Sequence, residues 1–297
     1  MTEYEEHRGL DAQTLQEVAA SLREVFADPA TVDDALEELG WNEIAELDPA
    51  TTTTLLFDTA GHTLATTRLL DDVVRKATGH AGPVAYAAGE LVVALGPVDA
   101  GADLLVVGRE CRTVTAGAVS AVTGFDTGGD WHVIEVGAGS ATEPTAGPDI
   151  LALARRALSA EINGMCRAAL ELAAQHTSTR EQYGRYLATF QAVRHALAES
   201  YAAIELSRVT LEAAWVSDDP VTASTVAKHQ AGASQATVMQ RTVHVLGAMG
   251  LTLESDMHRY VSRAAALDTL LGDHNELAAE LGAMLLHGGP ADPVASI

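Results

Sequence analysis

Four long stretches of helical hydrophobic periodicity fill the second half of the chain. In each, apolar residues recur at three- and four-residue spacing, as on the buried face of an amphipathic helix. The stretches are residues 149–178, 188–216, 220–247 and 256–286. Asp219 and Pro220 start the third stretch as N-cap and first-turn proline, and Gly247 and Gly250 end it. Four such helices with short connections predict an antiparallel four-helix bundle over residues 149–288.

The first half of the chain carries two further patterns. Helical periodicity over residues 1–79 predicts an abbreviated N-terminal helical domain. Short β-rich runs over residues 80–137, punctuated by Gly, Asp and Pro, predict a compressed β-domain, a small antiparallel sheet or barrel. The helical stretches are 12–26, 33–46 and 54–76, with a break over 48–54; residues 138–148 are predicted to be a linker and 289–297 a tail. The expected fold class is mainly α with a small β-domain.

The charge distribution narrows the range of partners. The net charge is −23, which opposes nucleic-acid binding because phosphates would be repelled. Residues 1–150 hold 26 acids and 7 bases, whereas residues 151–297 hold 15 acids and 11 bases, so an anionic cofactor is expected to meet the second half. No apolar run reaches about 18 residues, so no membrane span is expected. The two cysteines and the acidic N-terminus predict a reduced, cytoplasmic protein. The histidines are scattered, so no metal site is expected.

The connection between the first two predicted helices carries the most specific chemistry. It reads Thr177-Ser-Thr-Arg-Glu-Gln-Tyr-Gly-Arg-Tyr before the next apolar run. Gly184 is a natural turn point. Arg180 can direct two N–H donors at a phosphate, and Tyr183 offers a flat face to a base.

This segment resembles the helical hairpin of the flavin-dependent acyl-CoA dehydrogenases. Arg180-Glu-Gln-Tyr-Gly is followed by Phe190-Gln-Ala-Val-Arg, then by Ala227-Lys and Leu246-Gly-Ala-Met-Gly, in the family's order. The resemblance implies an acyl-CoA dehydrogenase-like fold, FAD as cofactor and an acyl-CoA substrate. The residues that it implies for binding FAD, often across a subunit interface, are Arg180, Tyr183, Gln191, His244, Gly247 and Gly250.

The same resemblance implies that the usual catalytic base is absent. The family takes the substrate's α-proton with a carboxylate from one of two positions, and these match Ala154 and Leu271, which cannot accept a proton. The nearest substitutes in sequence are Asp273, Glu276 and Glu161. Glu161 lies seven residues past Ala154, about 10 Å along a helix axis, and is expected to miss the substrate.

The hypothesis that follows is a subunit of a heteromeric enzyme. A full-length acyl-CoA dehydrogenase partner, in an α2β2 heterotetramer, would supply the base, the flavin-ring pocket and the acyl site. Apolar residues on more than one side of the bundle helices, among them Ile204, Leu206 and Val238, favour such an interface. Short subunits of this kind occur in actinobacterial enzymes that act on steroid side-chain CoA thioesters. Two alternatives stay open: a self-sufficient homomeric dehydrogenase with a displaced base, and a non-enzymatic assembly scaffold.

Overall fold

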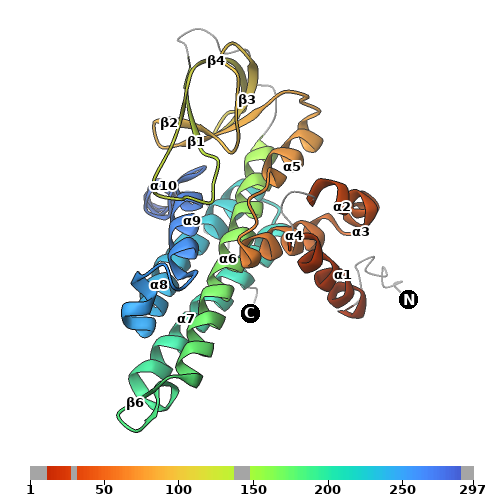
Figure 1. The fold of residues 1–297 in the computed structure, drawn as a ribbon. Helices are drawn as coiled ribbons and strands as arrows, with labels where there is room; N and C mark the ends of the chain where they lie inside the picture. The colour runs from red at the N-terminus through yellow and green to blue at the C-terminus, as the bar shows by residue number, and fades with distance from the viewer. Residues whose placement is uncertain (1–11, 28–31, 137–147, 289–297) are drawn as a thin grey trace, which may run out of the picture.

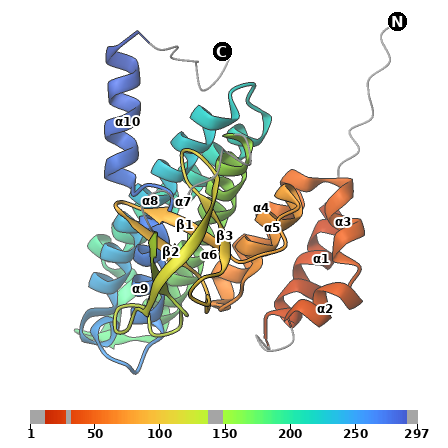
Figure 2. The same cartoon turned by 90° about the horizontal axis from the view of Figure 1, so that it is seen from above.

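The computed structural model describes residues 12–27, 32–136 and 148–288. A β-barrel lies at one end of a helical bundle, and the N-terminal helices pack beside the bundle (Figure 1). Viewed from above, the barrel lies over the bundle, with the first five helices on one side and α10 (His274–Leu286) on the other (Figure 2). None of the described helices is long and apolar enough to span a membrane. The predicted tail and residues 138–147 of the predicted linker lie outside the described residues.

The N-terminal helices are shorter and more numerous than predicted. They are α1 (Ala12–Val25), α2 (Val32–Glu38), α3 (Trp41–Leu47), α4 (Pro49–Thr63) and α5 (Leu69–Thr78). The expected helix over 33–46 is split at Gly40, and the expected helix over 54–76 is split after Leu64, because both residues adopt positive φ. The expected break over 48–54 is instead a helix start, since the Asp48 carboxylate accepts the backbone N–H of Thr51 at 3.1 Å and Pro49 opens α4.

Two glycines set the crossing between α4 and α6 (Pro148–Thr179). A Cβ atom placed on Gly164 would lie 1.9 Å from the backbone oxygen of Asp58, and one placed on Gly61 would lie 2.0 Å from that of Glu161. The two backbones are therefore in direct contact, as small residues at a helix crossing allow. An ion pair between Asp58 and Arg167 lies beside the crossing.

The β-domain is a closed barrel in the order β1-β2-β5-β4-β3. Its strands are β1 (Val84–Ala88), β2 (Leu91–Ala94), β3 (Asp103–Val107), β4 (Arg112–Ala121) and β5 (His132–Val136). β1 and β3 pair in parallel, and all other neighbours are antiparallel. β4 is a single long strand with a register shift between Ala116 and Val119. Small side chains such as Ala85 and Ala94 fill the interior with Leu104 and Ile134.

The bundle consists of α6, α7 (Gln191–Val216), α8 (Pro220–Leu246) and a fourth arm. That arm is not the single helix expected over 256–286. It is divided into α9 (Met257–Thr269) and α10 by a turn at Leu270–Asp273, where Leu271 and Gly272 have φ values of 59° and 100°. No long helix can continue through two consecutive positive-φ residues. The division matters because Leu271 is one of the two expected base positions.

Candidate functional site

A cavity of about 740 Å³ lies between the barrel, the start of α6 and α10. Its apolar lining includes Ala87, Leu151, Leu271, Leu277 and Ala283. Its charged lining consists of Arg155 from α6, Glu276 and Glu280 from α10, and Glu90 and Arg109 from the barrel. Arg109 and Glu280 form an ion pair of 3.0 Å at the rim.

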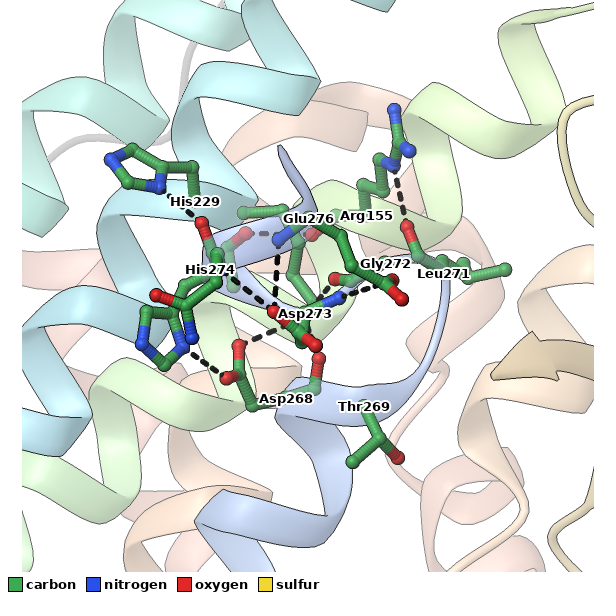
Figure 3. Close-up of polar contacts among 12 residues, drawn as sticks. Arg155, His229, Asp268, Thr269, Leu271, Gly272, Asp273, His274 and Glu276 are labelled. Atoms are coloured by element: carbon green, nitrogen blue, oxygen red, sulfur yellow. Dashed lines mark hydrogen bonds and ion pairs between the residues drawn. The ribbon is translucent and has the colours of Figure 1, made fainter. Parts of the chain in front are cut away.

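The turn at Leu271 is held by its backbone rather than by its side chain. The Leu271 N–H donates to the carbonyl of Ala87 in β1 at 2.7 Å, and its own carbonyl accepts from Nε of Arg155 at 3.0 Å. Figure 3 shows Leu271 and Gly272 beside Arg155, at the edge of a polar network. Leu271, one of the two positions predicted for the base, is buried and apolar.

Beneath this turn lies a buried charge network. Nζ of Lys228 donates to the backbone oxygen of Asp268 at 2.8 Å and to that of Gly272 at 3.2 Å, and contacts the Asp268 carboxylate at 3.3 Å. The other Asp268 oxygen lies 2.5 Å from Nδ1 of His274. Nδ1 of His229 lies 2.8 Å from the backbone oxygen of His274 (Figure 3). Burial lowers the pKa of Lys228 to about 8, even though Asp268 acts in the opposite direction. The network fixes the α9–α10 turn on α8.

Neither the other base position nor its two closest substitutes offers a free carboxylate. Ala154 is fully buried within α6. Asp273 caps α10, because its carboxylate accepts the backbone N–H groups of Asn275 and Glu276 at 2.7 and 3.0 Å. Glu276 completes this capping box by accepting the N–H of Asp273 at 3.3 Å. Both acids therefore stabilise the start of a helix.

Glu161 has the raised pKa expected of a general base, but the cavity beside it is too small for a substrate. Burial raises the pKa of its carboxylate to about 7. It lines a separate cavity of about 20 Å³, which has room for about one water molecule. Arg263 also lines this cavity, and its ion pair with Asp126 at 2.6 Å links α9 to the loop before β5.

Glu161 makes stability depend on pH. Its folded-state pKa of about 7 exceeds the ordinary 4.5, so the folded chain retains the proton where the unfolded chain has lost it. Stability should fall as pH rises from 4.5 to 7 and stay reduced above that. Glu161→Gln should remove this slope and raise the free energy of unfolding at pH 8 by about 2 kcal/mol. Urea unfolding at pH 5 and pH 8 measures the effect, with the exposed Glu135→Gln as control. An unchanged pH slope in Glu161→Gln would contradict the assignment.

The residues predicted to bind FAD lie far from the cavity. Glu181–Gln182 (β6) and Arg185–Tyr186 (β7) form a small hairpin beyond the end of α6, at the bottom of Figure 1. Tyr183 and Gly184 form its tip with φ values of 53° and 73°, and positive φ at both central residues is what a type I′ turn requires. Gly184 was predicted as the turn point, and the structure confirms it. Tyr183 is 91% exposed.

Arg180 and Arg185 lie on the hairpin segment, and Arg194 lies in the first turn of α7. Arg180 is exposed, and within the described part of the chain its guanidinium has no ion pair or hydrogen bond. Arg185 stacks on Phe190, with 4.0 Å between its guanidinium carbon and the ring centroid, and Arg194 donates to the carbonyl of Ala188 at 2.8 Å. The exposed Gln191 begins α7 next to them. This arrangement has the donor chemistry of a site for a diphosphate.

The second predicted group lies at the C-terminus of α8. His244 is exposed and Gly247 has a φ of 63°, where a side chain would be strained. Gly250 is buried, and a Cβ on it would lie 2.9 Å from the backbone oxygen of Val243. Gly250 therefore already has a structural reason to be glycine. No hydrogen bond or ion pair between described residues joins this group to the hairpin.

Helix α6 separates the cavity from the hairpin. Arg155 lies near its start and Arg180 just past its end, and the 25 intervening steps correspond to about 37 Å along the axis. A dinucleotide cofactor is shorter than this even when fully extended. A single ligand of that size cannot contact both sites in one chain.

Comparison with known proteins assigns the bundle. The family model described as "Acyl-CoA dehydrogenase, C-terminal domain" matches residues 149–286. The bundle matches the C-terminal domain of the acyl-CoA dehydrogenases. Acyl-CoA dehydrogenase IpdE2 of Mycobacterium tuberculosis is 31% identical over 141 residues, which cover 47% of this chain and 44% of that protein. Acyl-CoA dehydrogenase FadE34 of the same organism is 32% identical over 127 residues, which cover 40% of this chain and 18% of that protein. The matched segment thus spans less than half of either relative.

Solved structures extend the likeness to the whole fold. A chain of the ChsE4-ChsE5 complex from Mycobacterium tuberculosis superposes with a TM-score of 0.67 and 21% identity, covering 96% of this chain and 100% of that one. A chain of the Tcur3481-Tcur3483 steroid acyl-CoA dehydrogenase variant gives a TM-score of 0.65 and 24% identity, covering 96% and 91%. The predicted fold class, an acyl-CoA dehydrogenase-like chain of N-terminal helices, β-domain and bundle, is confirmed.

Sequence reasoning missed the role of several buried polar groups. Periodicity and the family resemblance assign no role to Arg155, and Lys228 enters only through the Ala227-Lys match. Their signal was present, because Arg155 and Lys228 interrupt strongly apolar helix faces. What the sequence could not reveal is that they converge on one turn, since that depends on the break between α9 and α10.

Proposed function

We propose that this chain is a subunit of a FAD-dependent acyl-CoA dehydrogenase that lacks its own base and binds the ADP part of the cofactor for a full-length partner. The proposal rests on the distance between two features of the structure. One is a hairpin that carries arginines, and the other, about 37 Å away along α6, is a turn without a catalytic base. The hairpin has donors for an anionic ligand, yet among the residues that the structure describes no catalytic carboxylate lies within reach of that ligand. The rest of the active site would come from another subunit.

The hairpin residues fit the diphosphate and adenine of FAD. Arg180 would donate charge-assisted hydrogen bonds to the diphosphate oxygens, and Gln191 would donate through its amide. Tyr183 would offer its exposed ring to the adenine. His244 and the turn at Gly247 and Gly250 would approach the cofactor from α8. The cavity at Leu271 fits the cofactor poorly, because three rim glutamates would face its phosphates.

The proposed reaction introduces a Cα–Cβ double bond into an acyl-CoA thioester. FAD, when bound, supplies the hydride acceptor. Removal of the α-proton requires a carboxylate in an apolar pocket, where desolvation raises its pKa. Ala154 and Leu271 cannot do this, and Asp273 and Glu276 are committed to capping α10. The partner must therefore provide the proton acceptor, while this chain orients the cofactor.

Exposed apolar residues on α7 support the binding of a partner subunit to this helix. Leu206, Val209 and Val216 are exposed at helical spacing, with Val216 at 84%. The expected interface residues Ile204 and Val238 are instead buried within the chain, in the core. Assembly as an α2β2 heterotetramer and a steroid side-chain thioester as substrate are parts of the proposal that rest on the likeness to the ChsE4-ChsE5 complex and to the steroid acyl-CoA dehydrogenase.

Separate and joint purification of the subunits tests the proposal. The chain is expressed alone and together with a full-length acyl-CoA dehydrogenase encoded beside it, and each preparation is assayed with steroid and fatty acyl-CoA thioesters and a dye acceptor. We expect turnover and stoichiometric FAD only in the joint preparation. Turnover by the chain alone would favour the homomeric alternative, and a complex whose activity and flavin content do not depend on this chain would favour the scaffold.

Arg180→Ala should weaken cofactor retention. The substitution removes a charge-assisted contact of the kind worth about 1.5–3 kcal/mol, so FAD affinity of the complex should fall roughly ten- to a hundred-fold. Arg180→Lys should restore only part of it, because an ammonium cannot reproduce the planar fork. The measurements are FAD per complex after gel filtration and thermal unfolding of the flavin-free form. The control is Arg112→Ala, which changes an exposed arginine on β4 of the barrel; full flavin occupancy in Arg180→Ala would refute the role of Arg180.

A further inference from the structure

The guanidinium of Arg155 has unused donors that face the cavity. Arg155 is 3% exposed, although it lies at the wall of a large cavity. Its Nε donates to the carbonyl of Leu271 at 3.0 Å, and its Nη1 donates to Oγ1 of Thr225 at 2.7 Å. Of five N–H groups, these contacts use two. The remaining three, one on Nη1 and two on Nη2, have no acceptor among the described residues.

Both acceptors of Arg155 are neutral, so its charge is not compensated by contact. Burial lowers the pKa of Arg155, and the carboxylate that opposes this effect is that of Glu280, which is itself paired with Arg109 at 3.0 Å. A buried cation without a partner carboxylate is costly, and an anion that reaches it gains from the low local dielectric. The free edge formed by Nη1 and Nη2 matches the two oxygens of one carboxylate.

The rest of the cavity determines what the anion can carry. Leu151, Leu271, Leu277 and Ala283 provide an apolar lining next to Arg155, which suits a hydrocarbon body. Glu90, Glu276 and Glu280 stand around the same cavity and oppose any second negative charge. A ligand with one carboxylate and an apolar body satisfies both conditions, whereas a phosphorylated thioester does not.

We propose that this cavity binds an amphipathic monocarboxylic acid, with its carboxylate on the Nη1–Nη2 edge of Arg155 and its hydrocarbon body against the leucines. The site is separate from the hairpin and does not depend on the proposed dehydrogenase role. It lies against the turn that joins α9 to α10, so an occupant contacts Leu271 directly. Occupation should stabilise this turn by mass action.

Titration calorimetry with three ten-carbon probes tests the proposal on the full chain in the assembly in which it is purified. Decanoate should bind, while decanol, which lacks the charge, and sebacate, which carries a second carboxylate, should each bind at least ten-fold more weakly. Equal binding of decanol would show a purely apolar pocket. Equal binding of sebacate would show that the rim glutamates do not discriminate against a second carboxylate.

Two variants separate recognition from folding. Arg155→Met should weaken decanoate binding ten- to a hundred-fold, with Arg109→Met as the rim control that leaves the buried donor intact. Because Arg155→Met also removes the contacts to Leu271 and Thr225, Ala283→Phe is the second variant: it fills the cavity without touching Arg155 and should abolish binding. Decanoate that binds both variants as it binds the unaltered chain would overturn the proposal.

Discussion

Gly164→Ala is expected to destabilise the folded chain by about 3 kcal/mol or more, one of the largest effects of any single methyl group in the structure. The added Cβ would lie 1.9 Å from the Asp58 backbone oxygen and 2.9 Å from the His62 backbone nitrogen. Both atoms belong to α4, so no side-chain rotation relieves the overlap. The helices must separate, and the ion pair between Asp58 and Arg167 would be stretched. Urea and thermal unfolding measure the loss, with an expected fall in Tm of roughly 6 °C or more.

Gly282→Ala provides the matched control. Gly282 is also helical, in α10, and a Cβ there meets no atom within 4 Å. Alanine should stabilise by about 0.5–1 kcal/mol, because glycine loses more backbone entropy on folding. The two substitutions are chemically identical and should act in opposite directions. A neutral result at Gly164 would mean that α4 and α6 are not in backbone contact.

Lys228→Met should also cost about 3 kcal/mol, for an electrostatic reason. The substitution orphans the carbonyls of Asp268 and Gly272 and leaves the Asp268 carboxylate with His274 as its remaining side-chain partner. Lys228→Met combined with Asp268→Asn should recover part of the loss, because the unpaired charge is gone. Equal stability of the single and double variants would argue against a charge network.

The pH dependence gives a second signature of the same lysine. Its folded-state pKa of about 8 lies below the ordinary 10.5, so between these values the unfolded chain binds a proton that the folded chain does not. Stability contributed by this group therefore rises as pH increases from 8 to 10.5 and is lower below pH 8. Lys228→Met should lose this slope. Denaturant midpoints from pH 7 to pH 10.5 record it.

Periodicity predicted the helical class and the first three bundle helices to within a few residues. It failed where a single residue adopts positive φ. Leu64 and Leu271 are typical helix formers that adopt left-handed conformations. The Leu64 N–H bonds back to its own helix at Gly61, whereas the Leu271 N–H is held by a tertiary contact, the carbonyl of Ala87 in β1. Propensity contains no information about such contacts. Gly40 could have been recognised as a break, because glycine is the usual residue at such positions.

The candidate site also has one part that the sequence could predict and one part that it could not. The hairpin chemistry is local, so Gly184 could be assigned from sequence as its turn point and Arg180 and Tyr183 proposed as its binding groups. The cavity is assembled from the barrel, α6 and α10, which are more than 100 residues apart in places, as Ala87 and Leu271 are. The role of the buried Arg155 becomes clear only in the structure, where the Leu271 carbonyl and Thr225 accept two of its N–H groups. No spacing rule connects those residues.

The projecting hairpin has a thermodynamic consequence for any assembly that shares a ligand with it. A ligand held on one side by Arg180 and on the other by a second subunit bridges two molecules. Ligand binding and subunit association are then linked equilibria, and each must strengthen the other by the same factor. Diluting the protein would release the ligand, and adding the ligand would lower the protein concentration needed for assembly. The concentration of subunits would thereby control occupancy at a site that no single chain completes.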